Sequence, residues 1–529
     1  MVMAVLAGLS VMAQSRGMLC KSDISYISPS DKSSYRQEKC KLDVWYPENA
    51  QDSQVLVWLH GGGLTGGEKY FPNEFAGQNI IVVSVNYRLS PEAECPAYIE
   101  DAAEAVAWVV KNIKSFGGDP RKINVSGHSA GGYLTLMLCL DKSYLQKHGI
   151  DADSIEGYYP VSGESITHFT VRGENNIPYL TPLIDKYAPI YHSRKIGAKL
   201  ALFTGDRKLE LPARCEENIY LKDALERDGN EKIPMFEFEG FDHNTCVHPA
   251  SLLILKHMNG SDPQTVFKET IFTQSEAVRA RYETLVDIPY VSEDEPSGYR
   301  KERCLLDIHY PKDQKNCKVL VWFHGGGLKS GIKEIPEAMM YGDVVVVSVD
   351  YRFSPEVKAP AYIEDAAAAV AWVHKHIAEY NGNPDDIFVS GASAGGYLTL
   401  MLAMDKHYLA DAGYDADKIS GYISLTGQTS RHTALNDEAG LDEHYKVVAD
   451  ELSPLANARN CTPPVWLITG ERGIDRPTRY AQNLYLYAVL KSMGKENVSH
   501  YGISGYGHGG AGYEGSMIMR RILDFTPAK

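Results

Sequence analysis

The sequence predicts an α/β fold built as two tandem domains, each with a mostly parallel β-sheet covered by helices on both faces. The first observation is a pentapeptide, Gly-His-Ser-Ala-Gly at 127–131, which recurs in the second half of the chain as Gly-Ala-Ser-Ala-Gly at 391–395. The second is the tetrapeptide His-Gly-Gly-Gly, which occurs at 60–63 and, at the same spacing, at 324–327. The third is that short apolar runs alternate with helical patterns around both copies, which is typical of parallel sheets. The chain therefore contains one domain twice.

In the first copy, the expected elements follow one another in the order that such a sheet requires. Leu42 to Tyr46 alternates apolar and polar residues as an outer strand does, whereas Val55 to Leu59 and Ile80 to Val85 are continuous apolar runs, as strands buried on both faces should be. Ile123 to Ser126 is the strand that leads into the 127–131 turn, and Ala130 to Leu140 is the helix that leaves it. The other expected elements are a helix from Asp101 to about Ile113, strands at Gly157 to Pro160, Leu200 to Thr204 and Met235 to Glu239, and a helix near Glu216 to Arg227.

The extent of the repeat divides the chain into four segments. Pro96 to Trp108 matches Pro360 to Trp372 at all but one position, and the second copy repeats the same order of elements from Ile288 onward. Gly260 to Leu285 shows no counterpart in the first copy, begins with the turn-like Gly-Ser-Asp-Pro, and has a helical pattern at Gln274 to Glu283. We therefore predict a leader at 1–21, a first domain at 22–260, a connector at 261–286 and a second domain at 287–529.

Length and composition fit two ordinary globular domains. The chain has 529 residues, of which 44% are hydrophobic and 23% are charged, and this argues against disorder. Its net charge of −15 argues against nucleic acid as a partner, because phosphate binding needs concentrated Lys and Arg. Nothing in the sequence predicts the oligomeric state.

The N-terminal segment has the pattern of a targeting sequence. Val2 to Ala13 is an apolar run that is too short to span a bilayer, and Val11 and Ala13 are the small residues that signal peptidase prefers before its cleavage point. We expect cleavage after Ala13, export to the periplasm or the medium, and no membrane span, although a positively charged n-region is missing.

The pattern of cysteines predicts free thiols and not disulfides common to both domains. There are nine, and of these only Cys40 and Cys304 recur at the repeat spacing, so a bridge common to both domains is not expected. Most are expected to be buried free thiols, and a Cys304–Cys317 bridge stays open. No Cys-x-x-Cys pair and no histidine cluster with metal spacing occurs, and we expect neither a metal nor an organic cofactor.

The duplicated pentapeptide is the pattern of a nucleophilic serine. It places Ser129 and Ser393 on a tight strand-to-helix turn, where small neighbours leave the hydroxyl accessible. Together with the glycine loop upstream, the pattern resembles the α/β-hydrolase superfamily, specifically the hormone-sensitive-lipase and acetyl-esterase group. The motifs Tyr-Arg-Leu-Ser-Pro-Glu at 87–92 and Gly-Asp-Pro at 118–120 also look like that group, and the resemblance covers nearly the whole chain, twice.

The resemblance implies a donor site for a developing oxyanion in each domain. Glycine allows the backbone to approach the substrate carbonyl closely, and backbone N–H groups supply the donors. His60 and His324 are expected to anchor the glycine loops through hydrogen bonds and not to act as bases. The candidate donors are Gly62, Gly63 and Ala130 in the first copy, and Gly326, Gly327 and Ala394 in the second.

The base is expected to come last in chain order, in a loop after the final strand. His243 and His508 fit this position and correspond to each other in the two copies. His168 and His432 also recur, but they precede the strand that should carry the acid, so we assign them a pocket-lining or structural role.

Each copy offers two candidates for the acid. Related esterases usually carry it three residues after the glycine that ends this strand, but the two copies have Lys208 and Gly473 there. Each copy has one carboxylate five residues after the glycine and another directly after it. We select the first pair, Glu210 and Asp475, and expect the alternatives, Asp206 and Glu471, to accept hydrogen bonds from turn amides.

The sequence as a whole indicates an exported serine esterase with two catalytic sites. The tandem layout resembles bacterial esterases that remove acetyl or feruloyl groups from plant polysaccharides, so the expected substrate is a small ester or an esterified oligosaccharide. One alternative is a peptidase, since the residues at 129–133 also resemble the prolyl-oligopeptidase catalytic domain, although the segment ahead of the first repeat is too short for its usual β-rich domain. Another is one catalytic domain beside a binding-only domain on the same scaffold.

Overall fold

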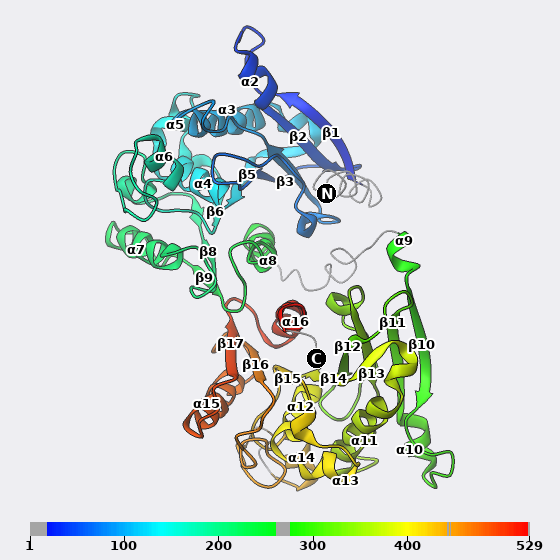
Figure 1. The fold of residues 1–529 in the computed structure, drawn as a ribbon. Coiled ribbons are helices and arrows are strands. Elements are labelled where there is room, and N and C mark those ends of the chain that lie inside the picture. The colour runs from blue at the N-terminus through cyan, green and yellow to red at the C-terminus, as the bar shows by residue number, and fades with distance from the viewer. Residues whose placement is uncertain (1–17, 261–275, 442–443, 445, 527–529) are drawn as a thin grey trace. The chain divides into compact units, whose positions relative to one another are not determined.

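The computed structural model describes residues 18–260, 276–441, 444 and 446–526. The chain divides into two compact units, Met1–Ile271 and Phe272–Lys529, and each is built as an α/β domain (Figure 1). The predicted leader, with its expected cleavage after Ala13, lies outside the described residues except for its last few positions. Within the described part of the chain, no helix combines the length and the apolar character that crossing a membrane requires.

The first unit contains one sheet in which antiparallel strands precede parallel ones. Strand β1 pairs antiparallel with β2, and β2 pairs antiparallel with β4; from β4 onward the neighbours β3, β5, β6, β8 and β9 are parallel, with the short β7 also beside β6. The strands are β1 (Met18–Ser25), β2 (Lys41–Pro47), β3 (Ser53–Leu59), β4 (Ile80–Val85), β5 (Gly118–His128), β6 (Gly157–Val161), β7 (Lys199–Leu200), β8 (Leu202–Gly205) and β9 (Met235–Phe238).

The second unit has the same strand order and the same register. For example, Val57 of β3 lies opposite Val125 of β5, and their equivalents in the repeat, Val321 of β12 and Val389 of β14, also lie opposite each other. Its strands are β10 (Tyr282–Pro289), β11 (Leu305–Pro311), β12 (Cys317–Phe323), β13 (Val344–Val349), β14 (Gly382–Ala392), β15 (Gly421–Leu425), β16 (Val465–Gly470) and β17 (Val498–Ile503). The prediction of two tandem α/β domains is confirmed.

Helices cover both faces of each sheet because the central strands are apolar on both sides. In β3, Val55 and Val57 join the core beneath α3 (Ala97–Asn112) and α4 (Ala130–Leu140). The alternate residues Leu56 and Trp58 are also fully buried, on the face where Gln54 donates to the Met258 carbonyl of α8 (Val247–Asn259) at 3.0 Å. The other helices of this unit are α2 (Ser34–Lys39), α5 (Lys142–Gln146), α6 (Phe169–Glu174) and α7 (Arg214–Arg227).

The helices of the second unit follow the same plan. They are α9 (Glu276–Arg279), α10 (Gly298–Arg303), α11 (Ala361–His376), α12 (Ala394–Met404), α13 (His407–Asp411), α14 (Thr433–Glu438), α15 (Arg479–Ser492) and α16 (His508–Phe525).

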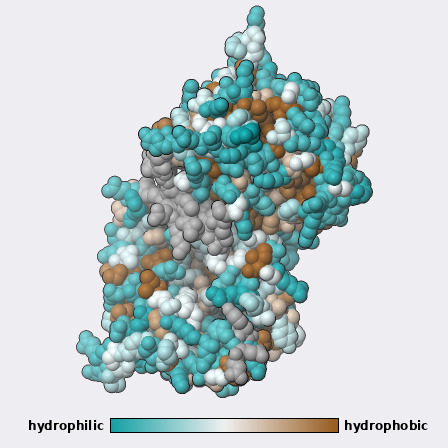
Figure 2. All heavy atoms as spheres, turned by 180° about the vertical axis from the view of Figure 1, so that it is seen from behind, coloured by the Kyte–Doolittle hydropathy of each residue, from teal (hydrophilic) through white to brown (hydrophobic). Residues whose placement is uncertain are grey.

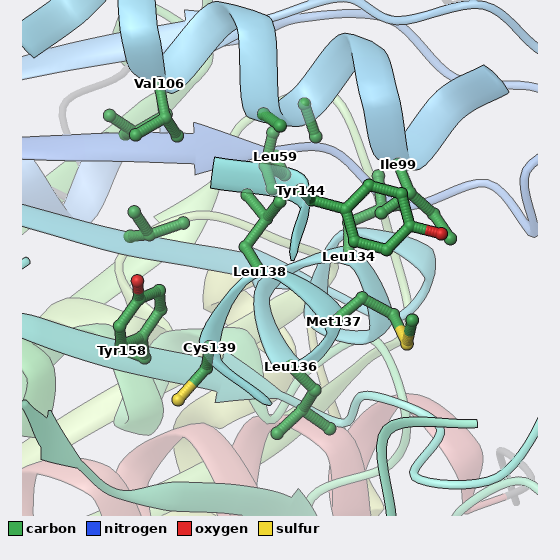
Figure 3. Close-up of a cluster of buried hydrophobic side chains, with 14 of the residues drawn as sticks. Leu59, Ile99, Val106, Leu134, Leu136, Met137, Leu138, Cys139, Tyr144 and Tyr158 are labelled. Atoms are coloured by element: carbon green, nitrogen blue, oxygen red, sulfur yellow. The ribbon is translucent and has the colours of Figure 1, made fainter. Parts of the chain in front are cut away.

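Helix α4 lies at the centre of the first core. All eleven of its residues are buried, so it is apolar around its whole circumference and not amphipathic. Leu134 and Leu138 point toward Leu59 of β3 and the helix α3, and Tyr158 of β6 lies beside Cys139 (Figure 3). On the face shown in Figure 2, hydrophobic side chains form patches between hydrophilic ones. The large apolar side chains of the described residues are mostly buried in the two cores.

The domain boundaries differ from the predicted ones at both N-terminal edges. Strand β10 begins at Tyr282, inside the predicted connector, and corresponds to β1, which begins at Met18, inside the predicted leader. Most residues of both strands are exposed, polar and apolar residues do not alternate regularly in them, and each strand pairs along one edge, so their sequence signal is weak. Of the helical pattern expected at 274–283, the described part forms a helix only at Glu276–Arg279.

The cysteines are free thiols, as expected for most of them. All nine are unbridged, seven of them are buried, and the Cys304–Cys317 bridge that the sequence left open is not formed.

Candidate active site

Each nucleophile candidate occupies a strained turn between a central strand and the buried helix. Ser129 has φ 56° and ψ −113°, and Ser393 has φ 55° and ψ −110°, a conformation that costs free energy for a residue with a Cβ. The turn is held because the Ser129 N–H donates to the Val161 carbonyl at 2.9 Å. Glycine is required on its inner side, since a Cβ on Gly131 or Gly395 would overlap the carbonyl oxygen of the neighbouring strand, at Leu59 or Phe323.

In the first domain the structure brings Ser129, His243 and Glu210 together. His243 Nε2 lies 2.9 Å from Ser129 Oγ, and His243 Nδ1 lies 2.8 Å from Glu210 Oε2. His243 comes from the loop between β9 and α8, and Glu210 from the loop after β8. The three side chains therefore form the relay that a serine nucleophile needs, in which a base accepts its proton and an acid orients the base.

The second domain repeats this geometry with the shorter acid. His508 Nε2 lies 2.9 Å from Ser393 Oγ, and His508 Nδ1 lies 2.9 Å from Asp475 Oδ1. His508 begins α16, and Asp475 lies in the loop after β16. Both copies thus hold a complete Ser–His–acid set.

Each acid is held charged by its histidine and by backbone N–H groups of its turn. Burial favours the neutral form of Glu210, but the hydrogen bond and charge of His243, together with Ser162 and the Gly205 N–H, outweigh it and lower its pKa to about 2. Asp475 is likewise buried, and His508 and the N–H groups of Arg476 and Gly470, at 2.6 and 2.9 Å, lower its pKa. An ionised acid is the form that stabilises an imidazolium.

The alternative acids contact backbone amides and not the histidines. Asp206 accepts from the N–H groups of Lys208 and Gly240, each at 2.9 Å, and Glu471 accepts from the N–H of Gly505 at 2.5 Å. This is the turn-stabilising role expected of them.

The glycine loops have the conformation and the anchors expected for a donor site. Gly62 and Gly63 have φ of 114° and 65°, and Gly326 and Gly327 have 111° and 67°, all in the region that favours glycine. His60 stacks on Tyr87 with ring centroids 4.3 Å apart, its Nδ1 lies 2.6 Å from the Gly61 carbonyl, and burial lowers its pKa to about 4. His60 is therefore neutral and anchors the loop.

His324 has the corresponding contacts in the second domain. Its ring stacks on Tyr351 with centroids 4.5 Å apart, its Nδ1 lies 2.6 Å from the Gly325 carbonyl, and its Nε2 lies 3.1 Å from Asp350 Oδ1. Ala130 and Ala394 begin the helices directly after the serines, so their N–H groups face the same region.

His168 and His432 are the N-cap residues of α6 and α14, the helices that border the two cavities. Nδ1 of His168 accepts from the Thr170 N–H at 3.2 Å, and His432 accepts in the same way from Ala434. Burial, reinforced by nearby arginines, lowers the pKa of His168 well below its usual value and that of His432 to about 3. His432 lines the cavity of its domain, whereas in the first domain the following residue, Phe169, takes that place.

Sequence reasoning missed several residues that touch the relay. Ser162 directly follows β6, donates to Glu210 and lies 3.0 Å from His243 Nδ1; its φ of 52° is matched by 49° at Thr426 in the second domain. His128, beside the nucleophile, has its Nε2 2.7 Å from the His243 carbonyl. The position of Ser162 in the sequence could have indicated it. Ser162 lies at the carboxyl end of β6, next to the nucleophile turn, and functional polar side chains gather at this edge of parallel sheets.

A cavity opens at each serine, and the two cavities differ in lining. The first has a volume of about 640 Å³ and includes Phe169, Tyr70 and Leu211 beside Ser129 and His243. The second has a volume of about 470 Å³ and includes Lys329, Arg476 and Gln428 beside Ser393 and His508. No group of three His, Cys, Asp or Glu side chains that could hold a metal ion occurs within the described ranges.

A comparison with protein families finds the same family in both copies of the repeat. A family model described as BD-FAE matches residues 42–189 and 306–490, which together make up more than half of the chain and contain both nucleophile turns. The chain belongs to the BD-FAE family. Its two matched regions begin at the strands β2 and β11, so the BD-FAE match follows the duplication seen in the fold.

Curated relatives of this BD-FAE chain are esterases by name. A probable isoprenylcysteine alpha-carbonyl methylesterase of Oryza sativa subsp. japonica is 26% identical over 235 residues, which are 39% of this chain and 55% of that protein. A carboxylesterase of Mycobacterium tuberculosis is 43% identical over 101 residues, 18% of this chain and 32% of that protein. With the first of these, the chain spans about half the relative's length.

Solved structures with a similar fold are described as esterases too. A truncated form of a carbohydrate esterase from gut microbiota is 20% identical, with a TM-score of 0.38, over 46% of this chain and 96% of that one. An esterase of Pyrobaculum calidifontis is 23% identical, with a TM-score of 0.34, over 46% of this chain and 84% of that one.

Proposed function

We propose that this protein is a carboxylic ester hydrolase with two serine sites, one in each domain. The observation that carries the proposal is the duplicated hydrogen-bonded set, in which a histidine lies 2.9 Å from the serine in both domains and 2.8 or 2.9 Å from an ionised acid. The esterase names of its relatives support the same reaction.

The proposed reaction follows from the geometry. The serine Oγ attacks the ester carbonyl while the histidine Nε2 accepts its proton, and the acid stabilises the imidazolium that forms. Backbone N–H groups of the glycine loop and of Ala130 or Ala394 stabilise the oxyanion. The imidazolium then gives its proton to the leaving alcohol, and a water molecule, deprotonated by the same histidine, hydrolyses the acyl-enzyme. None of these steps needs a cofactor.

For the substrate, we propose acetyl or feruloyl esters on plant polysaccharides, with export of the protein to reach them. Phe169 and Tyr70 in the first cavity support an aromatic acyl group, since aromatic rings pack favourably with one another. N-terminal sequencing of the protein secreted by its native host tests the export proposal, which expects Gln14 as the first residue; a protein retained in the cytoplasm with Met1 would contradict it.

The serine variants test the catalytic proposal. Ser129→Ala and Ser393→Ala should each remove one site, and the double variant should lose on the order of 10⁶ in turnover. Hydrolysis of p-nitrophenyl acetate, methyl ferulate and acetylated xylan by each single variant assigns substrates to sites. A double variant that keeps more than a few per cent of the wild-type rate would contradict the proposal, and cleavage of peptide p-nitroanilides in preference to esters would favour a peptidase.

A further inference from the structure

The two domains differ at one structurally equivalent position beside the acid. Leu211 follows Glu210, and Arg476 follows Asp475; the backbone N–H of each donates to that acid, at 2.9 and 2.6 Å. Both residues line the cavity of their own domain. Because the same hydrogen bond fixes the backbone in both domains, the two side chains occupy equivalent positions in the cavity lining. This position is apolar in the first domain, at Leu211, and cationic in the second, at Arg476.

The other lining residues differ in the same direction. Among the described residues, Glu68 is the single lining residue of the first cavity with a formal charge, and no Lys or Arg lines it. The second cavity has Lys329, Arg476 and Arg479 in its lining and no Asp or Glu among the described lining residues. Lys329 stands where the first domain has Thr65.

Two carboxylates of the first domain, one buried and one half-buried, are also missing from the second. In the first domain, Arg214 lies 2.7 Å from Glu217 and 3.9 Å from Glu164. The residues at the positions of these glutamates in the second domain are Gln482 and Gln428, and both line the cavity. No carboxylate at these two positions therefore repels an anion in the second cavity.

Arg476 is the cation best placed to meet a ligand. Lys329 is already paired with Asp437 at 2.6 Å, so its charge is partly balanced. The Arg476 side chain is exposed and makes no ion pair with the residues that the structure describes, while it lines the cavity that contains Ser393 and His508. A guanidinium presents paired N–H groups that match the two oxygens of a carboxylate.

We propose that the second site prefers esters that carry a carboxylate near the scissile bond, which Arg476 binds, whereas the first site takes neutral esters. This inference rests on the proposed esterase function. The carboxylate belongs either to the alcohol, as in an acylated uronic acid, or to the acyl group, as in a monoester of a dicarboxylic acid.

The test measures each site separately in the full chain. The Ser129→Ala variant reports the second site and Ser393→Ala the first. The alcohol side is probed with 4-acetoxybenzoate against its neutral analogue 4-acetoxybenzamide, and the acyl side with monophenyl adipate against phenyl hexanoate. The readout is the ratio of kcat/KM for the anionic and the neutral ester in each pair. For at least one pair, we expect this ratio to be about tenfold higher at the second site, a size typical of a hydrogen bond to a charged group.

Exchange variants at the equivalent positions make the test specific. Arg476→Leu, in the Ser129→Ala background, should lower the ratio about tenfold, and Leu211→Arg, in the Ser393→Ala background, should raise it. Arg472→Leu is the matched control, because Arg472 is an exposed arginine in the same loop that does not line the cavity, and it should leave the ratio unchanged. Thermal melts of all variants show whether they are folded.

The outcomes separate this inference from the proposed function. If Ser129→Ala cleaves the neutral esters but shows the same ratio as Ser393→Ala, or if Arg476→Leu leaves its ratio unchanged, the carboxylate preference is wrong and the esterase function stands. If folded Ser129→Ala cleaves no ester and Ser393 takes no fluorophosphonate, the second site is not an esterase, and the inference is overturned with it.

Discussion

The acid of each relay is the residue that the sequence left most open, and the structure brings the selected residues, Glu210 and Asp475, to the histidines. The sequence offered two carboxylates per domain, and the family's usual position held neither. The structure shows why a residue five positions after the glycine can serve: the Glu210 N–H donates to the Asp206 carbonyl at 2.9 Å, and that of Asp475 to Glu471 at 3.0 Å. This turn brings the carboxylate back to the end of the strand, where the histidine lies.

Conservative acid substitutions test this assignment. Glu210→Gln, in a Ser393→Ala background, should lower kcat by several orders of magnitude, since loss of the acid costs about 10⁴ in the best-studied triad. Asp206→Asn, in the same background, should mainly lower the melting temperature, because its carboxylate holds backbone amides. Asp475→Asn and Glu471→Gln, in a Ser129→Ala background, should behave in the same way. The reverse ranking in both domains would move the acid to the residue next to the glycine.

The pH dependence of the second site is a further prediction at this scale. Burial lowers the pKa of His508 from 6.5; Asp475 opposes this, and the positive charges of Arg479 and Arg476 lower it further. A general base acts when it is deprotonated, so kcat/KM of the Ser129→Ala variant should rise with pH around a midpoint below 6.5. Arg476→Leu removes one of the positive charges that lower the pKa of His508 and should shift this midpoint upward. A midpoint above the ordinary histidine value, or one that Arg476→Leu shifts downward, would contradict this account.

Among the elements, the strand–turn–helix unit around each serine is the one most fully determined by its sequence. Gly131→Ala should destabilise the first domain strongly, because the new Cβ would overlap the Leu59 carbonyl and the backbone has no room to move. Gly173→Ala, in α6, is the matched control: its Cβ would meet nothing within 4 Å, and alanine should add up to about 1 kcal/mol of helix stability. Thermal unfolding measures both. A Gly131→Ala variant with the wild-type melting temperature and activity would contradict the close packing described for this turn.

The sequence predicted the elements that are strongly apolar and missed those that are not. The buried strands β3 and β4 and the helix α4 were predicted within a few residues, because a continuous apolar run is stable only where both of its faces are buried. Strand β5 was expected at 123–126 but runs from Gly118 to His128, because its first residues are polar. Strands β1 and β10 were missed because they lie at a sheet edge and most of their residues are exposed. Helix α3 was expected from Asp101 but begins at Ala97, directly after Pro96. Ser162 was missed because its position after β6 indicates only a polar side chain near the site, whereas its role depends on tertiary contact with Glu210.

At the scale of the whole molecule, each domain should fold by itself. Each has a complete sheet, its own buried core and its own Ser–His–acid set. Residues 18–260 and 276–529, expressed separately, should each show a cooperative thermal transition and hydrolyse esters. Residues 290–529, which lack β10, should melt several degrees lower than 276–529, because β11 loses its antiparallel partner. If neither of the longer fragments unfolds cooperatively, the division into two independent domains is wrong.

The central claim is that one chain carries two independent serine nucleophiles, and covalent labelling tests it most directly. A fluorophosphonate reacts with a serine only where a base activates it and an oxyanion site receives the phosphonyl oxygen. Intact-mass measurement of the labelled protein should show two adducts in the wild type, one in Ser129→Ala, one in Ser393→Ala and none in the double variant. A wild-type protein that takes a single adduct, lost in only one of the serine variants, would contradict the account and indicate that one domain binds without catalysing.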